Sequence, residues 1–306
     1  MPESRTAKPR IAVIGLGSMG FGMATSLRRK DFDVTGCDVA GDLVARFVAD
    51  GGKGAKTPAE AAKGADIVIS VVLNAAQTET ILFGKDGVVE TMAKDTVFVS
   101  SATMDPEVAK RLAKQLEATG RHYLDAPISG GAQRAAQGEL TILASGSAAA
   151  FAKARPALDA MAAKLYELGD AAGHGAAFKM INQLLAGVHI AAASEAITFA
   201  ARQGLDLQKV YEVITASAGN SWMFENRMPH VIAGDYKPRS AVEIFVKDLG
   251  IVQDMARNAR FPATLASAAL QMFLMASASG MGRDDDASVA RLYGRISGTK
   301  LPGEPK

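Results

Sequence analysis

The stretch that decides the fold is RIAVIGLGSMG, residues 10–20, an apolar run that ends in three spaced glycines. Its first half has the uninterrupted apolar character of a buried parallel strand. The glycines fit the pattern G-x-G-x-x-G, and residues 21–30 continue with a helical pattern before a second short strand, DVTGCD, at residues 33–38. The segment therefore predicts the β-α-β unit that opens a doubly wound parallel sheet.

Each glycine of this turn has its own expected role. Gly15 allows the tight turn, Gly17 lets backbone N–H groups approach a pyrophosphate, and Gly20 lets the helix pack closely on the strand. The phosphates would then lie at the positive N-terminus of the helix. We therefore expect a dinucleotide to be bound by the whole turn, namely Gly15, Leu16, Gly17, Ser18, Met19 and Gly20.

The kind of dinucleotide is indicated by Asp38, which lies 18 residues after Gly20 at the end of the second strand. A carboxylate at this place accepts hydrogen bonds from the ribose hydroxyls of NAD. It would repel a 2′-phosphate, and the first cation that follows it is Arg46. The sequence therefore favours NAD, with NADP as the less favoured alternative.

Composition limits the partners of the chain. Its 306 residues suffice for two domains, and a net charge of +2 with 6% aromatic residues supplies neither the basic surface nor the stacking platforms of a nucleic-acid-binding protein. A single cysteine, Cys37, excludes an internal disulfide and cannot make a zinc site alone. We therefore expect a small-molecule partner, no nucleic acid and no metal.

The cellular location is inferred from two segments, the polar start of the chain and its longest apolar stretch. Residues 1–10 are polar and lack the apolar stretch of a secretory signal. The longest apolar stretch, residues 184–201, is interrupted by Glu195, which a bilayer would disfavour strongly. We therefore expect a cytoplasmic protein that does not associate with a membrane.

The pattern along the chain changes near residue 172. Before it, β-branched runs alternate with helices, and further strands are expected at residues 66–73, 96–100, 123–124, 140–144 and 165–168. After it, only helical periodicity remains, at residues 176–203, 206–217, 244–259 and 262–275. We expect a Rossmann-type NAD-binding domain over residues 1–172 and an all-α domain for substrate binding and oligomerisation over residues 173–306, joined by a long interdomain helix. The apolar second domain predicts a homodimer or homotetramer.

Ligands of such sheets bind outside the carboxyl ends of the strands. By topology, Asn74, Ser101, Thr103 and Ser129 fall at this edge. We expect Leu73, Asn74 and Thr103 to contact the cofactor.

Lys179 is the candidate catalytic residue. It lies in GHGAAFKMINQ, residues 173–183, at the start of the long apolar helix, where helical spacing places Asn182 and Gln183 on its face. Oxidation of an alcohol needs a base for the hydroxyl proton, and desolvation disfavours the charged form of a lysine. The alternative is an ordinary surface lysine, because lysine is rarely buried.

Taken together, the motifs resemble the β-hydroxyacid dehydrogenase family, which includes 3-hydroxyisobutyrate dehydrogenase, along nearly the whole chain. LDAPISGG, residues 124–131, is similar to the substrate-binding signature of that family, and residues 173–183 are similar to its catalytic-lysine segment. SSATMDP, residues 100–106, and VKDL, residues 246–249, are similar to its cofactor-contacting segments.

The resemblance implies an NAD(P)-dependent oxidoreductase that acts on the CH–OH group of a hydroxy acid. Lys179 would be the general acid/base, Thr103 and Lys247 would contact the cofactor, and the substrate carboxylate would be held by Ser129, Gly130 and Gly131. Many relatives carry two asparagines after the lysine, whereas this chain has Asn182 and Gln183. Which of the two amides assists Lys179 stays open.

Two more segments bear on the substrate. AGVHIAAASE, residues 186–195, and AGNSWMFENR, residues 218–227, resemble members of the family that oxidise a four-carbon sugar acid with NAD. The polar Asn220, Ser221 and Asn226 also favour a polyhydroxylated acid such as threonate. The alternatives are glycerate, erythronate or 3-hydroxyisobutyrate as substrate, and tartronate semialdehyde or glyoxylate reduction. Lys179 argues against two other classes. A non-catalytic cofactor-binding module need not keep an acid/base, and an imine reductase would be expected to carry another proton donor in place of the lysine.

Three further segments are expected to have structural roles or, in the first case, a contact with the substrate. Trp222 and Phe224 would either close over the substrate or pack at a subunit contact. RDDD, residues 283–286, is expected to be a solvated loop, with pairing to a nearby Lys or Arg as the alternative. Residues 294–306 are expected to be a poorly ordered tail.

Overall fold

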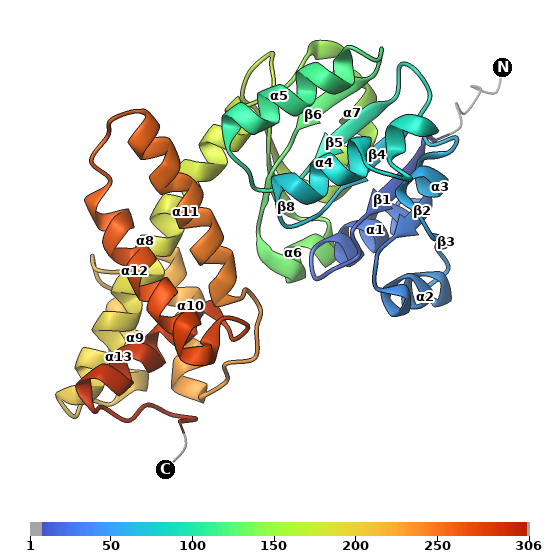
Figure 1. The fold of residues 1–306 in the computed structure, drawn as a ribbon. Helices are drawn as coiled ribbons and strands as arrows, with labels where there is room; N and C mark the ends of the chain where they lie inside the picture. The colour runs from blue at the N-terminus through green and yellow to red at the C-terminus, as the bar shows by residue number, and fades with distance from the viewer. Residues whose placement is uncertain (1–7, 305–306) are drawn as a thin grey trace. The chain divides into compact units, whose positions relative to one another are not determined.

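The computed structural model describes residues 8–304 of the chain. It divides into two compact units, of which the first ends at Lys179 and the second begins at Met180 (Figure 1). The domain limits expected from the sequence, 1–172 and 173–306, stay a prediction. Most of the polar start on which the expected location depends lies outside the described residues.

The first unit is an α/β structure with a six-stranded sheet. Its strands are β1 (Arg10–Ile14), β2 (Asp33–Cys37), β3 (Lys53–Ala55), β4 (Ile67–Ser70), β5 (Val97–Ser100) and β6 (His122–Asp125). They are all parallel, in the order β3-β2-β1-β4-β5-β6. This is the strand order of dinucleotide-binding sheets, so the doubly wound fold expected from residues 10–38 is confirmed. The point at which the strand order changes direction lies between β1 and β4.

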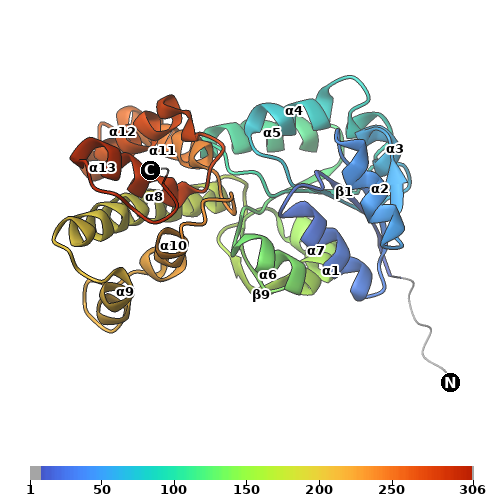
Figure 2. The same cartoon turned by 90° about the horizontal axis from the view of Figure 1, so that it is seen from below.

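Helices cover both faces of this sheet. They are α1 (Gly20–Arg29), α2 (Gly41–Ala49), α3 (Pro58–Ala62), α4 (Ala75–Phe83), α5 (Pro106–Glu117), α6 (Gly131–Gln137) and α7 (Ala148–Met161), with a 3₁₀ turn η1 at Val88–Glu90. Figure 2 shows α4 and α5 on one face of the sheet and α1, α6 and α7 on the other.

Alternation along each strand builds the two cores. In β1, Ile11 and Val13 face the core that contains α1 and α7, whereas Ala12 and Ile14 face the core that contains α4 and α5. Both sets are buried because a parallel sheet is covered on both faces. This double burial explains why residues 10–14 lack the polar alternation of a surface strand.

A second, three-stranded sheet consists of β7 (Ile128–Ser129), β8 (Leu140–Ala144) and β9 (Ala162–Glu167). The sequence predicted β8 and β9 but neither β7 nor β3. Both missed strands are short, two and three residues, and β3 contains Gly54. Such segments carry almost no periodic signal, and their strand geometry comes from pairing with a neighbouring strand.

The second unit is entirely helical over its described residues. It comprises most of α8 (His174–Arg202), then α9 (Leu207–Thr215), α10 (Trp222–Ala233), α11 (Val242–Asn258), α12 (Thr264–Ala276) and α13 (Val289–Ser297), with a π-helical turn η2 (Ser277–Met281) and a 3₁₀ turn η3 (Asp286–Ser288). The expected all-α part is thus confirmed. The sequence did not predict α10 and α13, which contain Pro229 and Gly294, residues that weaken a helical pattern.

The expected solvated loop at residues 283–286 is wrong for Asp285 and Asp286, whereas Arg283 is exposed. Asp285 and Asp286 are both completely buried. Arg227 of α10 donates to both oxygens of Asp286, at 2.5 and 3.0 Å, and His230 lies 3.0 Å from Asp285. The partners are 59 and 55 residues away along the chain, so the run of acidic residues alone could not reveal them.

The expected disordered tail is also wrong as far as residue 304. Residues 294–297 belong to α13, and Leu301 is buried. Tyr236 donates a hydrogen bond of 3.1 Å to the carbonyl of Pro302, and Arg291 forms an ion pair with Glu304. The tail therefore packs on the helical unit; residues 305 and 306 lie outside the described part.

Two helical segments, His174–Arg202 and Thr264–Met281, are long and apolar enough to cross a bilayer by length and composition. The core helix of a soluble protein has the same properties, and half of the apolar window in α8 is buried within the structure.

Candidate active site

The three glycines of the turn between β1 and α1 have different surroundings. A Cβ on Gly15, whose φ is +94°, would lie 2.3 Å from the carbonyl oxygen of Val71, and one on Gly20 would lie 1.8 Å from the carbonyl oxygen of Gly15. By contrast, a Cβ on Gly17 would meet no atom within 4 Å. The fold itself therefore needs Gly15 and Gly20, whereas the open space at Gly17 fits the backbone approach of a pyrophosphate.

Asp38 is held at this turn by two backbone donors. Its Oδ2 accepts a hydrogen bond of 2.6 Å from the N–H of Leu16, and its Oδ1 accepts one of 2.8 Å from Ala40. The carboxylate is therefore oriented before any ligand binds, beside the glycine turn. The side chain of Leu16 is fully buried in the core, so any contact of Leu16 with the cofactor is restricted to its backbone. Ser18 is exposed and Met19 half-buried.

The other expected cofactor residues lie at the carboxyl ends of β4 and β5. Asn74 caps α4, since its Oδ1 accepts a hydrogen bond of 2.9 Å from the N–H of Gln77. Leu73 is exposed, and its N–H donates to the side chain of Gln77. Thr103 is half-buried in the loop between β5 and α5. The structure thus gives Asn74 a structural function in addition to the expected cofactor contact.

The segment expected to hold the substrate carboxylate, residues 129–131, begins at the end of β7, and we call it the Ser129 loop. Ser129 pairs with Thr141 of β8 and is half-buried. Gly130 and Gly131 have φ values of +137° and +78°, a conformation that strains other residues. A Cβ on Gly131 would again meet no atom within 4 Å. The backbone at this loop can therefore approach a small ligand closely.

Lys179 lies in the second turn of α8 and is only 7% exposed. The alternative of an ordinary surface lysine is thereby removed. Gln183, one turn further along the same helix, is also 7% exposed, whereas Asn182 is exposed. Of the two amides within one turn of Lys179, only Gln183 shares its burial.

Gln183 is fixed by its neighbours. Its Oε1 accepts a hydrogen bond of 2.9 Å from Asn182, and its Nε2 donates to Oδ2 of the buried Asp248 on α11. The other oxygen of Asp248 forms an ion pair with Lys247. The expected cofactor residue Lys247 and the expected substrate residue Gln183 therefore share one carboxylate. The sequence contained Asp248 in the quoted segment, but the 65-residue separation from Gln183 hid the contact.

The start of α8 is anchored by a second buried carboxylate that sequence reasoning missed. Oδ2 of Asp125, at the end of β6, accepts hydrogen bonds of 3.0 Å from the N–H of Gly173 and 2.8 Å from that of Ala176. The hydroxyl of Ser145 accepts one of 2.9 Å from Gly175. Burial raises the pKa of Asp125 to about 6, although the backbone donors of α8 oppose this rise. Asp125 therefore caps the helix that carries Lys179.

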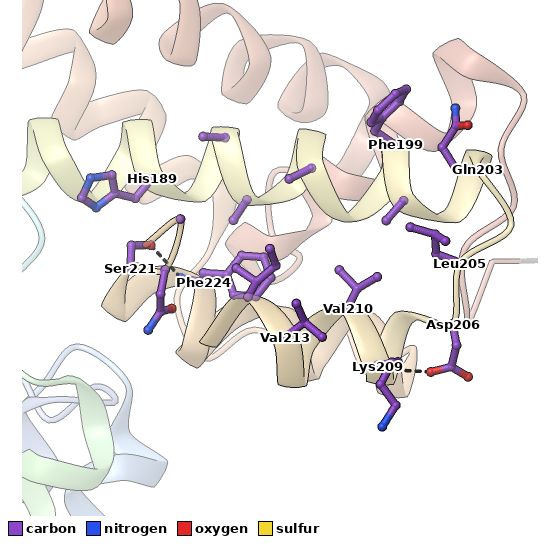
Figure 3. Close-up of a pocket in the computed structure, with 17 residues that line it drawn as sticks. His189, Phe199, Gln203, Leu205, Asp206, Lys209, Val210, Val213, Ser221 and Phe224 are labelled. Carbon is purple, nitrogen blue, oxygen red and sulfur yellow. Dashed lines mark hydrogen bonds between the residues drawn. The ribbon is translucent and has the colours of Figure 1, made fainter. Parts of the chain in front are cut away.

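The second unit contains an apolar groove of about 820 Å³ between α8, α9 and α10 (Figure 3). Phe224 lies in its wall and stacks on Tyr211, with ring centroids 6.2 Å apart. Val213 points from α9 toward α8. Phe224 is therefore part of the packing of this unit, and Trp222, which is half exposed, does not line the groove.

The polar residues beside Trp222 are used locally. Asn220 donates a hydrogen bond of 2.6 Å to Glu225, and Ser221 caps α10 by accepting one of 3.0 Å from the N–H of Phe224. Asn226 accepts from Arg227. Each of these three residues therefore has a structural contact of its own within the second unit.

No group of three or more His, Cys, Asp or Glu side chains with the arrangement of a metal site occurs among residues 8–304. Cys37 is buried, and burial raises the pKa of its thiol to about 11.

Comparisons with known proteins cover both units. Residues 10–169 match the family model of the NAD-binding domain of 6-phosphogluconate dehydrogenase. Residues 173–293 match the model described as the NAD-binding domain of NADP-dependent 3-hydroxyisobutyrate dehydrogenase. The first match alone spans more than half of the chain.

Full-length relatives agree with these matches. L-threonate dehydrogenase of Cupriavidus necator is 51% identical over 96% of this chain and 98% of its own length. The mitochondrial 3-hydroxyisobutyrate dehydrogenase of mouse is 31% identical over 94% of this chain and 88% of its own.

A solved structure named 3-hydroxyisobutyrate dehydrogenase, from Salmonella typhimurium, matches with a TM-score of 0.89 and 48% identity over 93% of this chain and all of its own. With the strand order, the glycine turn and the two matched family models, this places the chain in the 3-hydroxyisobutyrate dehydrogenase-like family of β-hydroxyacid dehydrogenases, NAD(P)-dependent oxidoreductases that act on CH–OH groups.

Proposed function

We propose that the protein oxidises L-threonate to its 2-oxo acid with NAD, and that Lys179 is the general acid/base. The observation that carries this proposal is the buried Lys179, at the start of a capped helix in the same unit as the glycine turn. The name of the Cupriavidus necator relative, at 51% identity, supports threonate as the substrate.

The reaction divides between the cofactor and the chain. NAD, when bound, supplies the acceptor for hydride. Lys179 in its neutral form takes the proton of the substrate hydroxyl, and its buried position keeps competing water away from the amine. In the reverse direction the ammonium returns this proton to the alkoxide oxygen. Gln183 holds an amide on the same face of α8, and we assign it, rather than Asn182, to the substrate.

The two ligands have separate binding residues in the proposal. The hydroxyl of Ser129 and the backbone N–H groups of Gly130 and Gly131 hold the substrate carboxylate. The glycine turn holds the pyrophosphate, and Asp38 accepts the ribose hydroxyls. Thr103, Leu73, Asn74 and Lys247 complete the cofactor contacts.

A substrate panel tests the function. L-threonate, erythronate, glycerate and 3-hydroxyisobutyrate are each supplied with NAD and with NADP, and NADH or NADPH formation is followed by absorbance. We expect the highest kcat/KM for threonate with NAD. Preference for 3-hydroxyisobutyrate, the substrate in the name of the Salmonella typhimurium structure, would replace threonate by that alternative. Better use of NADP would contradict the role of Asp38.

Lys179→Ala tests the mechanism. Loss of the acid/base should lower kcat by about 100- to 10,000-fold while NAD binding, measured by fluorescence titration, stays within about threefold. Lys53→Ala, which removes an exposed lysine paired with Asp33, is the control and should keep wild-type kcat. A Lys179→Ala variant with near-normal kcat would exclude Lys179 as the base.

We also propose that the protein acts as a homodimer or homotetramer in the cytoplasm. In support, the wall of the groove between α8, α9 and α10 carries large apolar side chains that are more than half exposed, Phe199, Leu205 and Val213. Contiguous exposed apolar surface of this kind is typical of protein interfaces. We assign it to a second copy of this chain, because Asp206 and Lys209 at its rim supply both signs of charge to a self-complementary contact.

A further inference from the structure

Three segments of the first unit meet at the first turn of α8. They are the helix start itself, the end of β6 at Asp125 and the residue after β8, Ser145. Helix starts leave N–H groups without partners inside the helix. In α8, the N–H groups of Gly175 and Ala176 and that of the preceding Gly173 are all satisfied by two buried side chains, Asp125 and Ser145. Most helices of this unit that have a side-chain cap use a single residue adjacent to the helix, such as Ser147 for α7.

The two capping residues are themselves tied together. Asp125 and Ser145 exchange backbone hydrogen bonds of 3.0 and 2.8 Å, and the Ser145 hydroxyl lies 3.3 Å from Oδ2 of Asp125. This bridge joins the end of β6 in the large sheet to the end of β8 in the small sheet. The cap is therefore built on two sheets, which leaves it little freedom to move.

The helix start is also pressed against the same backbone. A Cβ on Gly175 would lie 2.4 Å from the carbonyl oxygen of Leu143 and 2.9 Å from that of Asp125. Only glycine permits this approach. The cap thus fixes both the distance and the direction of α8 at its first turn, and Lys179 follows one turn later.

We propose that Asp125 is a positioning residue, which fixes the start of α8 and thereby sets where Lys179 stands relative to the Ser129 loop. Asp125 precedes Ser129 by only four residues, so the segment that is proposed to hold the substrate carboxylate also holds the helix of the base. A base and a substrate anchor that share one support keep their separation when the protein fluctuates. This inference rests on the proposed role of Lys179.

The predicted signature is a loss of kcat with little change in KM. In Asp125→Ala the N–H groups of Gly173 and Ala176 lose their acceptor, and the first turn of α8 loosens. Displacement of a catalytic group by about 1 Å costs on the order of 100-fold in rate, so kcat should fall by that factor. KM for the hydroxy acid and the dissociation constant of NAD should stay within about threefold, because the Ser129 loop and the glycine turn keep their own contacts.

Three further variants separate positioning from a general loss of stability. Asp125→Asn keeps an oxygen that can accept from the same donors, and it should restore kcat to within about tenfold of the wild type. Ser145→Ala removes the acceptor of Gly175 and the hydroxyl that donates to Asp125, and it should give an intermediate loss. Ser147→Ala removes the side-chain cap of α7, a helix that does not carry Lys179, and it should leave kcat unchanged.

Hydrogen exchange of the amides in residues 173–177 gives a readout without turnover. Exchange should be at least about tenfold faster in Asp125→Ala than in the wild type, and close to wild type in Asp125→Asn. If the wild-type enzyme turns over no acid of the panel, the proposed function fails while exchange still tests the cap. The proposal is overturned if folded Asp125→Ala keeps kcat, if Asp125→Asn is as impaired as Asp125→Ala, or if Ser147→Ala loses as much.

Discussion

At the scale of single residues, the glycines of the first turn have different neighbours and therefore different expected sensitivities. Gly20 lies against the backbone of Gly15, whereas Gly17 faces open space. This difference is not visible in the pattern G-x-G-x-x-G, in which all three glycine positions look alike. A pair of alanine substitutions can therefore distinguish a glycine required by the fold from one required by a ligand.

Gly17→Ala should keep the stability of the protein and weaken NAD binding. The added Cβ meets no atom within 4 Å, so the free energy of unfolding should stay equal or rise by about 0.5 kcal/mol. NAD affinity should fall at least about tenfold because the methyl group occupies the approach of the pyrophosphate. Gly20→Ala should instead destabilise the fold by about 3 kcal/mol or more. Urea unfolding and fluorescence titration check both, and unchanged NAD affinity in Gly17→Ala would place the cofactor elsewhere.

Asp125 should give the protein a component of pH-dependent stability. Its pKa rises from 3.8 to about 6 because of burial, so between these values the unfolded carboxyl ionises while the folded one keeps its proton. The contribution of Asp125 to the free energy of unfolding should therefore fall by about 2 kcal/mol as the pH rises from 4 to 7.

Asp125→Asn removes this titration. The difference in unfolding free energy between the variant and the wild type should thus grow in favour of the variant over that pH range. Urea unfolding at pH 4 and pH 7 measures it. An equal difference at both pH values would show that Asp125 does not change its protonation on unfolding.

At the scale of elements, α10 and the turn η3 are joined by a buried ionic cluster. Arg227 and His230 lie on α10, and their partners Asp286 and Asp285 lie at η3. Burial raises the pKa of Asp286, and the guanidinium of Arg227 opposes this effect. In Asp285 burial acts in the same direction, but the contact with His230 and the hydrogen bonds from the backbone N–H groups of Arg239 and Ala287 together outweigh it and lower the pKa.

Arg227→Met should therefore destabilise the protein strongly. It leaves Asp286 buried without its bidentate partner, which typically costs about 3 to 5 kcal/mol. Arg257→Met is the matched control, because Arg257 forms an exposed ion pair with Asp254 on α11 and should change stability by less than about 1 kcal/mol. Chemical denaturation compares the two; equal effects would mean that burial of the Arg227 pair has no energetic consequence.

At the scale of the whole molecule, the packing of the second unit does not explain the apolar groove of Figure 3. Its apolar walls come from α8, α9 and α10, and half of the apolar window in α8 is not buried within one chain. A second copy of the chain would cover such a surface without another partner.

Substitution in the groove should therefore lower the oligomeric state. The double variant Phe199→Glu with Val213→Asp places two charges on the apolar wall and should shift the mass measured by light scattering toward the monomer. Phe261→Glu is the control, since Phe261 is 64% exposed and lies outside the groove. A monomeric wild type, or an unchanged mass in the double variant, would contradict assembly through this groove.

The sequence by itself determined the parts of the protein that depend on neighbouring residues. The apolar run and glycines of residues 10–20, with Asp38 at the end of the next strand, predicted the parallel sheet and a dinucleotide site. The change of periodicity near residue 172 predicted the helical second half, and the motif around Lys179 identified the candidate base. These signals are local, because strand, turn and helix patterns arise within a few residues.

Only the tertiary structure decided the contacts between distant segments. Asp125 reaches the start of α8 over 48 residues, Gln183 reaches Asp248 over 65, and Arg227 reaches Asp286 over 59. No periodicity encodes such pairs, because a buried carboxylate and a solvated one have the same letters in the sequence. What distinguishes them is the desolvation that folding imposes and the donor that packing brings within hydrogen-bonding distance.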